Sequence, residues 1–239
     1  MIALLALGVT ALAVEPTTVM SRLDESTVFR KMRITPGVPD IPSSDYEKAA
    51  AGKVVTGLVS VDGYKAKKAY GLAIVDVPIE RFWAAINDDP SKVEYTKLDY
   101  TEILSGGHCA PARMVFQYLP VPLMTDRWWV SNMSTNGPLQ AASQGRIREM
   151  SWQTTDPRSL KSETAREWAE KGIPVGFSKG GWLLIDIDGT HTFVEYNAWS
   201  DPGGSVPVGL ANSFASGGIK DTFETMTQLA KDGPGCPIQ

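Results

Sequence analysis

The chain has 239 residues, of which 43% are hydrophobic and 21% are charged, so it can build a packed core in one large domain or two small ones. The formal net charge of -4 argues against a nucleic-acid partner held through phosphate contacts. Seven Trp, seven Tyr and seven Phe supply large aromatic surfaces, either for a core or for the wall of a pocket.

The first 13 residues are similar to a secretory signal peptide. Ile2–Leu12 is uncharged and apolar, but it is shorter than the roughly 20 residues that a membrane-spanning helix needs. Ala11-Leu12-Ala13 has the small residues of a cleavage site, although no Lys or Arg precedes the apolar run. We therefore expect an exported protein, periplasmic or secreted, if residues 1–13 are a signal. Otherwise they form a buried helix, and the protein is cytoplasmic.

Residues 14–44 form an N-terminal extension in which prolines end the helical pattern of Thr18–Met32. Ser43-Ser44-Asp45 then caps a short helix, Tyr46–Ala51. Two strands, Val54–Val61 and Lys65–Val77, flank Asp62-Gly63, a dipeptide that strongly indicates a hairpin turn.

The central part of the chain begins with a helix predicted over Pro78–Asn87, followed by four strands. Gly-rich and Pro-rich turns separate these strands, which is typical of an antiparallel meander. A short helix over Ser162–Lys171 comes after the fourth strand. The four predicted strands are Thr96–Leu104, Ala112–Leu119, Arg127–Thr135 and Gly145–Gln153.

The C-terminal part contains two more strands, Gly181–Asp188 and Thr190–Trp199, then a turn at Asp201–Pro207 and a long helix to Lys231. Ser205 can cap this helix, and proline suits its first turn. One face of the helix is apolar and must cover an apolar surface. The apolar residues are Ala211, Ala215, Ile219, Phe223, Met226 and Ala230. The order of elements predicts an α+β helix-grip fold, in which a curved antiparallel sheet wraps around the C-terminal helix and encloses a cavity.

Several segments, in this order, resemble the START family of lipid-transfer domains. Tyr118–Pro122 followed by Thr125–Val130 is similar to the family's proline turn and Arg-Asp-Phe-Val-type strand, with two tryptophans in place of Asp-Phe. Gly176–Trp182 is similar to its Gly-x-Trp strand, and Asp201–Pro207 with the following helix is similar to its C-terminal signature. The resemblance implies one START-like domain over residues 45–232, with 233–239 as a tail. It also implies that the chain binds a hydrophobic, lipid-like ligand in an internal cavity and transfers it.

Glu102 and Arg127 each lie in an otherwise apolar strand. The resemblance places them opposite each other in the cavity, where they pair and hydrogen-bond the polar end of a lipid. The alternative is an exposed sheet edge, where such a pair stabilises by less than about 1 kcal/mol. The full set of candidate ligand-binding residues is Glu102, Arg127, Trp129, Phe116, Tyr118, Trp182, Leu184, Tyr196, Asn197, Leu210 and Phe214.

The roles of several aromatic and polar residues in the last two predicted strands remain open. Trp182, Tyr196 and Trp199 either belong to the core or the cavity wall, or contact the ligand specifically. Glu195 and Asn197 are inward polar groups if they share an inner face with Trp199.

The sequence offers little for catalysis. His108 and His191 are the only histidines; His108 follows Gly106-Gly107 and His191 follows Asp188-Gly189-Thr190, so both are expected in turns. The sequence has no nucleophile elbow, phosphate-binding loop or metal-ligand spacing. We therefore expect a binding protein without catalytic residues, cofactor or metal. One alternative is a helix-grip enzyme of the polyketide cyclase or aromatase type, acting on a hydrophobic substrate. Another is a structural or interaction domain whose interior is filled and binds no ligand. Cys109 and Cys236 either form a disulfide that ties the tail to the domain or remain two unrelated thiols.

The expected partners are a hydrophobic small molecule and, transiently, a membrane, but no nucleic acid. We expect the C-terminal helix to move aside when the ligand enters. Gly217-Gly218 interrupts this helix, and each glycine lowers helix stability by about 1 kcal/mol relative to alanine. Alternatively, the two glycines permit close packing on the sheet. Leu210 and Phe214 are expected to touch the membrane when the start of the helix shifts.

Overall fold

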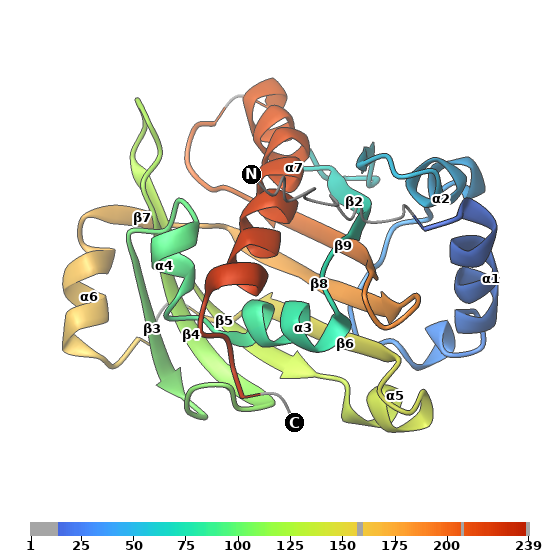
Figure 1. Cartoon of the computed structure of the whole chain (residues 1–239). Coiled ribbons are helices and arrows are strands. Elements are labelled where there is room, and N and C mark those ends of the chain that lie inside the picture. The colour runs from blue at the N-terminus through green and yellow to red at the C-terminus, as the bar shows by residue number, and fades with distance from the viewer. Residues whose placement is uncertain (1–13, 157–159, 207, 238–239) are drawn as a thin grey trace, which may run out of the picture.

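The computed structural model describes residues 14–156, 160–206 and 208–237, with the side chains of the last helix from residue 218 onward. The predicted signal peptide lies outside these residues. One sheet forms the body of the molecule, and helices lie on both of its faces (Figure 1). No described helix is both long and apolar enough to cross a membrane.

The helices are short except for the last one. They are α1 (Pro16–Ser26), α2 (Ser43–Ala50), α3 (Ile79–Asn87), α4 (Lys92–Tyr95), α5 (Gly137–Ala142), α6 (Glu163–Ala169) and α7 (Val208–Asp232), with one 3-10 turn at Arg30–Met32. The strands are β1 (Val55–Val59), β2 (Lys68–Val75), β3 (Tyr100–Ser105), β4 (Ala112–Leu119), β5 (Asp126–Thr135), β6 (Ile147–Thr154), β7 (Gly172–Pro174), β8 (Phe177–Asp186) and β9 (Thr192–Asp201).

The strands form a single sheet in the order β1-β2-β9-β8-β6-β5-β4-β3, and β7 pairs with β5. All pairs are antiparallel except β5 with β7. This confirms the predicted α+β class, with the C-terminal helix packed on an antiparallel sheet.

The inner face of the sheet, defined as the face that carries α7 and α3, holds the largest apolar cluster. Ile219, Phe223 and Met226 of α7 are buried there, as the apolar stripe predicted. The helix approaches β2 closely at Gly71, where an added Cβ would lie 2.3 Å from Cγ2 of Ile219. Glycine in the strand therefore permits the contact between helix and sheet.

The outer face is covered in two places. The N-terminal extension packs α1 and α2 over the outward side chains of β2, β8 and β9, with Val19 and Leu23 buried in the contact. At the other end of the sheet, Ala165 and Trp168 of α6 cover the outward aromatics of β4 and β5. The segment around α6, which falls outside the resemblance, therefore completes a third apolar cluster.

The structure differs from the predicted elements at a few places. Helices α4 and α5 were not predicted, and the strand expected from Thr96 begins four residues later because Thr96 closes the turn of α4 through its N–H to Lys92 O. The hairpin around Asp62-Gly63 is present, but its strands end at Val59 and resume at Lys68, so the connection is longer than a two-residue turn.

Candidate functional site

An aromatic cluster lies on the inner face beneath α7. The ring centroids of Trp182 and Tyr196 are 4.5 Å apart, and Trp152 stacks on Tyr196 at 5.5 Å. Phe223 of α7 contacts both Trp182 and Tyr196, at 6.1 Å and 6.4 Å. Strands β6, β8 and β9 thus each contribute one aromatic residue to the surface that the helix covers.

Tyr196 has an unusual environment within this cluster. Burial raises the pKa of its phenol to about 12, so the hydroxyl is neutral at physiological pH. The side chain nevertheless keeps some accessible surface, as does that of Trp152. Among the described residues, none forms a hydrogen bond with the Tyr196 hydroxyl. A buried phenol normally has such a partner.

The prediction that Glu102 and Arg127 pair is wrong, because the strand register places them on opposite faces. Glu102 is opposite Phe116, which in turn is opposite Val130 of β5. Arg127 is an odd number of residues from Val130 and therefore points to the other face. Glu102 faces outward and accepts a hydrogen bond from Tyr100 Oη at 3.0 Å.

Arg127 faces inward and binds backbone carbonyls. Its Nε donates to Pro202 O at 2.6 Å, its Nη2 donates to Gly203 O at 3.2 Å, and its Nη1 donates to Thr125 O. The guanidinium is buried, and these three bonds satisfy its charge locally. They also fix the loop that leads from β9 into α7.

A second buried arginine anchors the inner face near α3 and α4. Arg113 Nε contacts Asp89 Oδ2 at 2.5 Å, and Lys92 Nζ contacts Asp89 Oδ1 at 2.7 Å. Burial alone would raise the pKa of Asp89, but the two cations outweigh it and the pKa is lowered. Arg148, the third inner arginine, contacts Glu80 Oε1 at 3.5 Å.

Two buried carboxylates on the outer face bind the N-terminal extension. Glu195 is fully buried and contacts Arg33 and, at 2.8 Å, Arg30; it also accepts a hydrogen bond from Tyr46 Oη at 2.9 Å. Glu149, also fully buried, accepts from the backbone N–H of Ile34 at 2.8 Å. Glu195 is therefore not an inward polar group, because its face is the one opposite α7.

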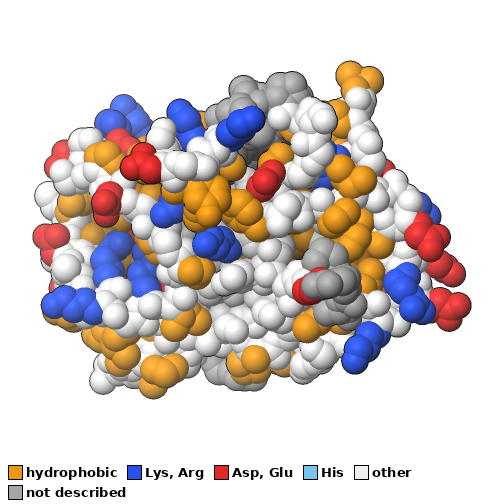
Figure 2. All heavy atoms as spheres, turned by 180° about the vertical axis from the view of Figure 1, so that it is seen from behind, with side chains coloured by type: hydrophobic (Ala, Val, Ile, Leu, Met, Phe, Trp, Pro, Cys, Tyr) orange, Lys and Arg blue, Asp and Glu red, His pale blue; other side chains and the backbone are white. Residues whose placement is uncertain are grey.

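The described part of the chain also contains a groove of about 580 Å³ between the N-terminal extension and strands β5 and β6. Figure 2 shows the molecule from the side opposite to that of Figure 1, with uncharged polar side chains and backbone in the centre. The residues that line the groove are Ile34, Pro36, Asn132, Ser134, Ser151, Trp152, Gln153, Thr154 and Thr155.

No protein-family model and no curated protein sequence matches the chain. Several solved structures, however, match the fold of the chain. A STAR-related lipid transfer protein fragment from Xanthomonas axonopodis aligns with a TM-score of 0.62 at 16% identity, covering 75% of this chain and 94% of the fragment. Human StAR-related lipid transfer protein 5 aligns with a TM-score of 0.60 at 12% identity, covering 91% and 98% of the two chains. A START superfamily protein from Mycobacterium smegmatis aligns with a TM-score of 0.51 at 6% identity, covering 69% and 97%.

The chain has the START-like fold. These identities are too low to carry over residue roles, so the likeness is one of architecture. Within this START-like fold, the inner face of the sheet and α7 together form the candidate site.

The predicted ligand-binding residues divide between the two faces of the START-like sheet. Those on the inner face are Arg127, Trp129, Trp182, Leu184 and Tyr196. Those on the outer face are Glu102, Phe116, Tyr118 and Asn197. Leu210 and Phe214 belong to α7, and their side chains fall outside the described part. The outer residues are covered by α6 or the N-terminal extension. They therefore cannot contact a ligand that lies between α7 and the inner face.

Sequence reasoning missed Trp152 and the arginines of the extension. Trp152 lies two residues after Met150 in β6, so both side chains point to the inner face. This two-residue spacing could have identified Trp152 once the pairing register was known. Arg30 and Arg33 lie in an irregular segment, where no periodicity indicates which surface they contact.

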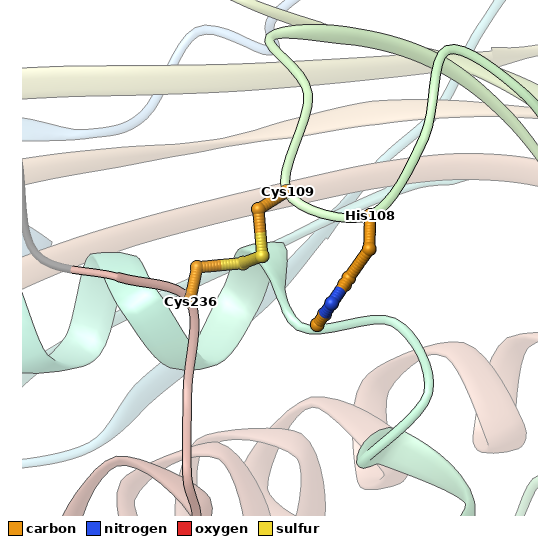
Figure 3. A group of neighbouring side chains, drawn as sticks. All are labelled: His108, Cys109 and Cys236. Carbon is orange, nitrogen blue, oxygen red and sulfur yellow. A yellow bond between two sulfur atoms is a disulfide. The ribbon is translucent and has the colours of Figure 1, made fainter.

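Cys109 and Cys236 form a disulfide, with their Cα atoms 5.7 Å apart, and so attach the C-terminal tail to the β3–β4 turn. His108 lies beside them, and the ligand atoms of the three residues are within 4.8 Å of one another (Figure 3). Because the sulfur atoms are bonded to each other, they are not thiolate donors for a metal. The His108 Nε2 contacts Asp88 Oδ1 at 2.9 Å instead.

Proposed function

We propose that the chain binds a hydrophobic, lipid-like molecule between α7 and the inner face of the sheet, and that it carries this molecule between membranes. The observation that carries the proposal is the aromatic cluster of Trp152, Trp182 and Tyr196, which Phe223 of α7 contacts. Trp152 and Tyr196 in this cluster are only partly buried. The lipid-transfer proteins with the same architecture support the same reading.

The driving force is burial of apolar surface, which contributes about 0.8 kcal/mol for each methylene group. The aromatic rings supply rigid contact area at a low entropic cost. The two histidines support binding over catalysis, because both lie in loops between strands, His108 against Asp88 and His191 against Asp188. Neither loop belongs to the aromatic cluster.

We also propose that the protein works in an oxidising compartment after export. The disulfide between Cys109 and Cys236 supports this location, because such bonds persist outside the reducing cytosol. Contact with a membrane is expected to be brief and hydrophobic. The net charge of -4 disfavours strong attraction to anionic lipid, and the sequence from Ser205 to Ile219 contains no charged residue.

Native mass spectrometry of protein purified without detergent tests the proposal. We expect a one-to-one complex with a lipid-sized mass, loss of that mass after organic extraction, and its return after incubation with vesicles. Quenching of tryptophan fluorescence by a brominated lipid should accompany rebinding, since two tryptophans line the site. Failure to recover any adduct, before or after incubation, would contradict the proposal. Recovery of a chemically altered molecule would instead point to a helix-grip enzyme.

A further inference from the structure

The cations that face inward from the strands are all engaged with protein groups, within the part of the chain that the structure describes. Arg113 is bound to Asp89, Arg127 to three backbone carbonyls, and Arg148 to Glu80. An anionic ligand group at this face would have to displace one of these partners. Removing Arg127 from its carbonyls would also leave those carbonyls without their donor.

The helix above the face directs no described charged side chain toward it, because Lys220, Asp221 and Glu224 are exposed. The sequence from Ser205 to Ile219, which includes the first half of α7, contains no Asp, Glu, Lys, Arg or His. A phosphate, carboxylate or ammonium group enclosed here would therefore lack a partner of opposite charge. Burying an unpaired charge is far more costly than burying a neutral polar group.

The face does present a neutral hydrogen-bonding group. Tyr196 is only partly buried, and its hydroxyl bonds to no described residue. It can donate one hydrogen bond and accept others. The rings around it, Trp152, Trp182 and Phe223, fit an apolar body.

We propose that the ligand has an uncharged polar end, such as a hydroxyl or a carbonyl, and that this end hydrogen-bonds the Tyr196 hydroxyl. The inference rests on the proposed function and specifies its ligand class. It excludes phospholipids and ionised fatty acids as the preferred ligands. It includes sterol-like alcohols, long-chain alcohols and diacylglycerols.

The first test compares lipids that differ only in the head group. Delipidated protein is incubated with vesicles that contain equal fractions of dioleoylglycerol, dioleoylphosphatidylcholine and dioleoylphosphatidylglycerol, and is then re-isolated for native mass spectrometry. We expect at least tenfold more bound dioleoylglycerol than either phospholipid. Equal or greater binding of a phospholipid would overturn this inference and leave the proposed function standing. Binding of none of the three, and of no sterol or long-chain alcohol added in the same way, would overturn both.

The second test removes the hydroxyl. Tyr196→Phe should raise the dissociation constant for dioleoylglycerol about fivefold to twentyfold and leave the affinity for the matching hydrocarbon unchanged. Tyr70→Phe is the matched control, because Tyr70 lies on the outer face of neighbouring β2 and donates to Asp45 Oδ2 at 2.6 Å. The control should bind dioleoylglycerol as the parent protein does. Unchanged affinity in Tyr196→Phe, or equal losses in the two variants, would overturn the assignment of Tyr196.

Discussion

Arg127 shows how a buried charge can be accommodated without an acidic partner. Desolvating a guanidinium is costly, and a carboxylate is the usual means of compensation. Here the compensation comes from carbonyl oxygens of Thr125, Pro202 and Gly203, two of which belong to the loop before α7. Arg127, which was predicted to bind the polar end of a lipid, therefore holds this loop instead.

This arrangement predicts different costs for two substitutions. Arg127→Leu should lower the free energy of unfolding by about 2–4 kcal/mol, because several hydrogen bonds to a charged donor are lost. Glu102→Gln should lower it by less than about 1 kcal/mol, because this half-buried carboxylate has a tyrosine hydroxyl rather than a cation as its partner. Urea denaturation measures both changes.

The double variant decides between the observed arrangement and a direct pair. If the two residues do not interact, the costs should add to within about 0.5 kcal/mol. A coupling energy above about 1 kcal/mol would show that Glu102 and Arg127 interact after all.

At the scale of elements, Gly71 of β2 and Gly218 of α7 have opposite surroundings. A Cβ added to Gly71 of β2 would lie 2.3 Å from Ile219 Cγ2 and 2.9 Å from a ring carbon of Phe223. A Cβ added to Gly218 of α7 would meet nothing within 4 Å. Close packing therefore accounts for the glycine in the strand but not for Gly218.

Alanine at each position should change stability in opposite directions. Gly71→Ala should destabilise by about 1–3 kcal/mol through overpacking. Gly218→Ala should stabilise by up to about 1 kcal/mol, because alanine favours the helix and the site has room for it. Thermal unfolding of the two variants provides the measurement. If Gly218→Ala also slows lipid transfer between vesicles while equilibrium affinity is unchanged, the glycine acts as a hinge. A loss of stability in Gly218→Ala would contradict the observed packing.

Local patterns were sufficient to predict most elements but not their mutual orientation. Alternation located β4 over Ala112–Leu119, and the 3.6-residue periodicity identified the buried stripe of α7. Alternation also indicated which residues share a face within one strand. It could not show which face of one strand matches which face of another, and this is why Glu102 and Arg127 were paired incorrectly. The pairing register, which depends on long-range contacts, settles that question.

At the scale of the whole molecule, the two ends of the described chain are fastened by different chemistry. The disulfide joins residues 127 positions apart, and the chain-entropy model assigns such a loop about 5 kcal/mol of stabilisation. The N-terminal extension is instead held by Glu195 and Glu149, which contact Arg30, Arg33 and the backbone near Ile34. Only the second attachment depends on ionised carboxylates, so acid should affect the two ends differently.

Glu195 determines the direction of that pH dependence. Burial alone would raise the pKa of its carboxyl above the ordinary value of 4.5, but Arg33 and Arg30 outweigh burial and lower it. A carboxyl whose pKa is lower in the folded state contributes stability above its unfolded pKa and loses it as pH falls through the folded pKa. We therefore expect the extension to stay attached at neutral pH and to loosen below about pH 4.5.

Hydrogen exchange of the amides in α1 and Arg30–Met32, followed between pH 7 and pH 3 and corrected for the intrinsic exchange rate, measures this loosening. Glu195→Gln should lower the stability of the extension at neutral pH by about 3–5 kcal/mol, because Arg30 loses its buried partner and Arg33 keeps only Glu149. The variant should also lose most of the acid dependence. Glu47→Gln, which alters an exposed carboxylate of α2, should retain all of it. Equal acid dependence in the parent protein and in Glu195→Gln would show that another group releases the extension.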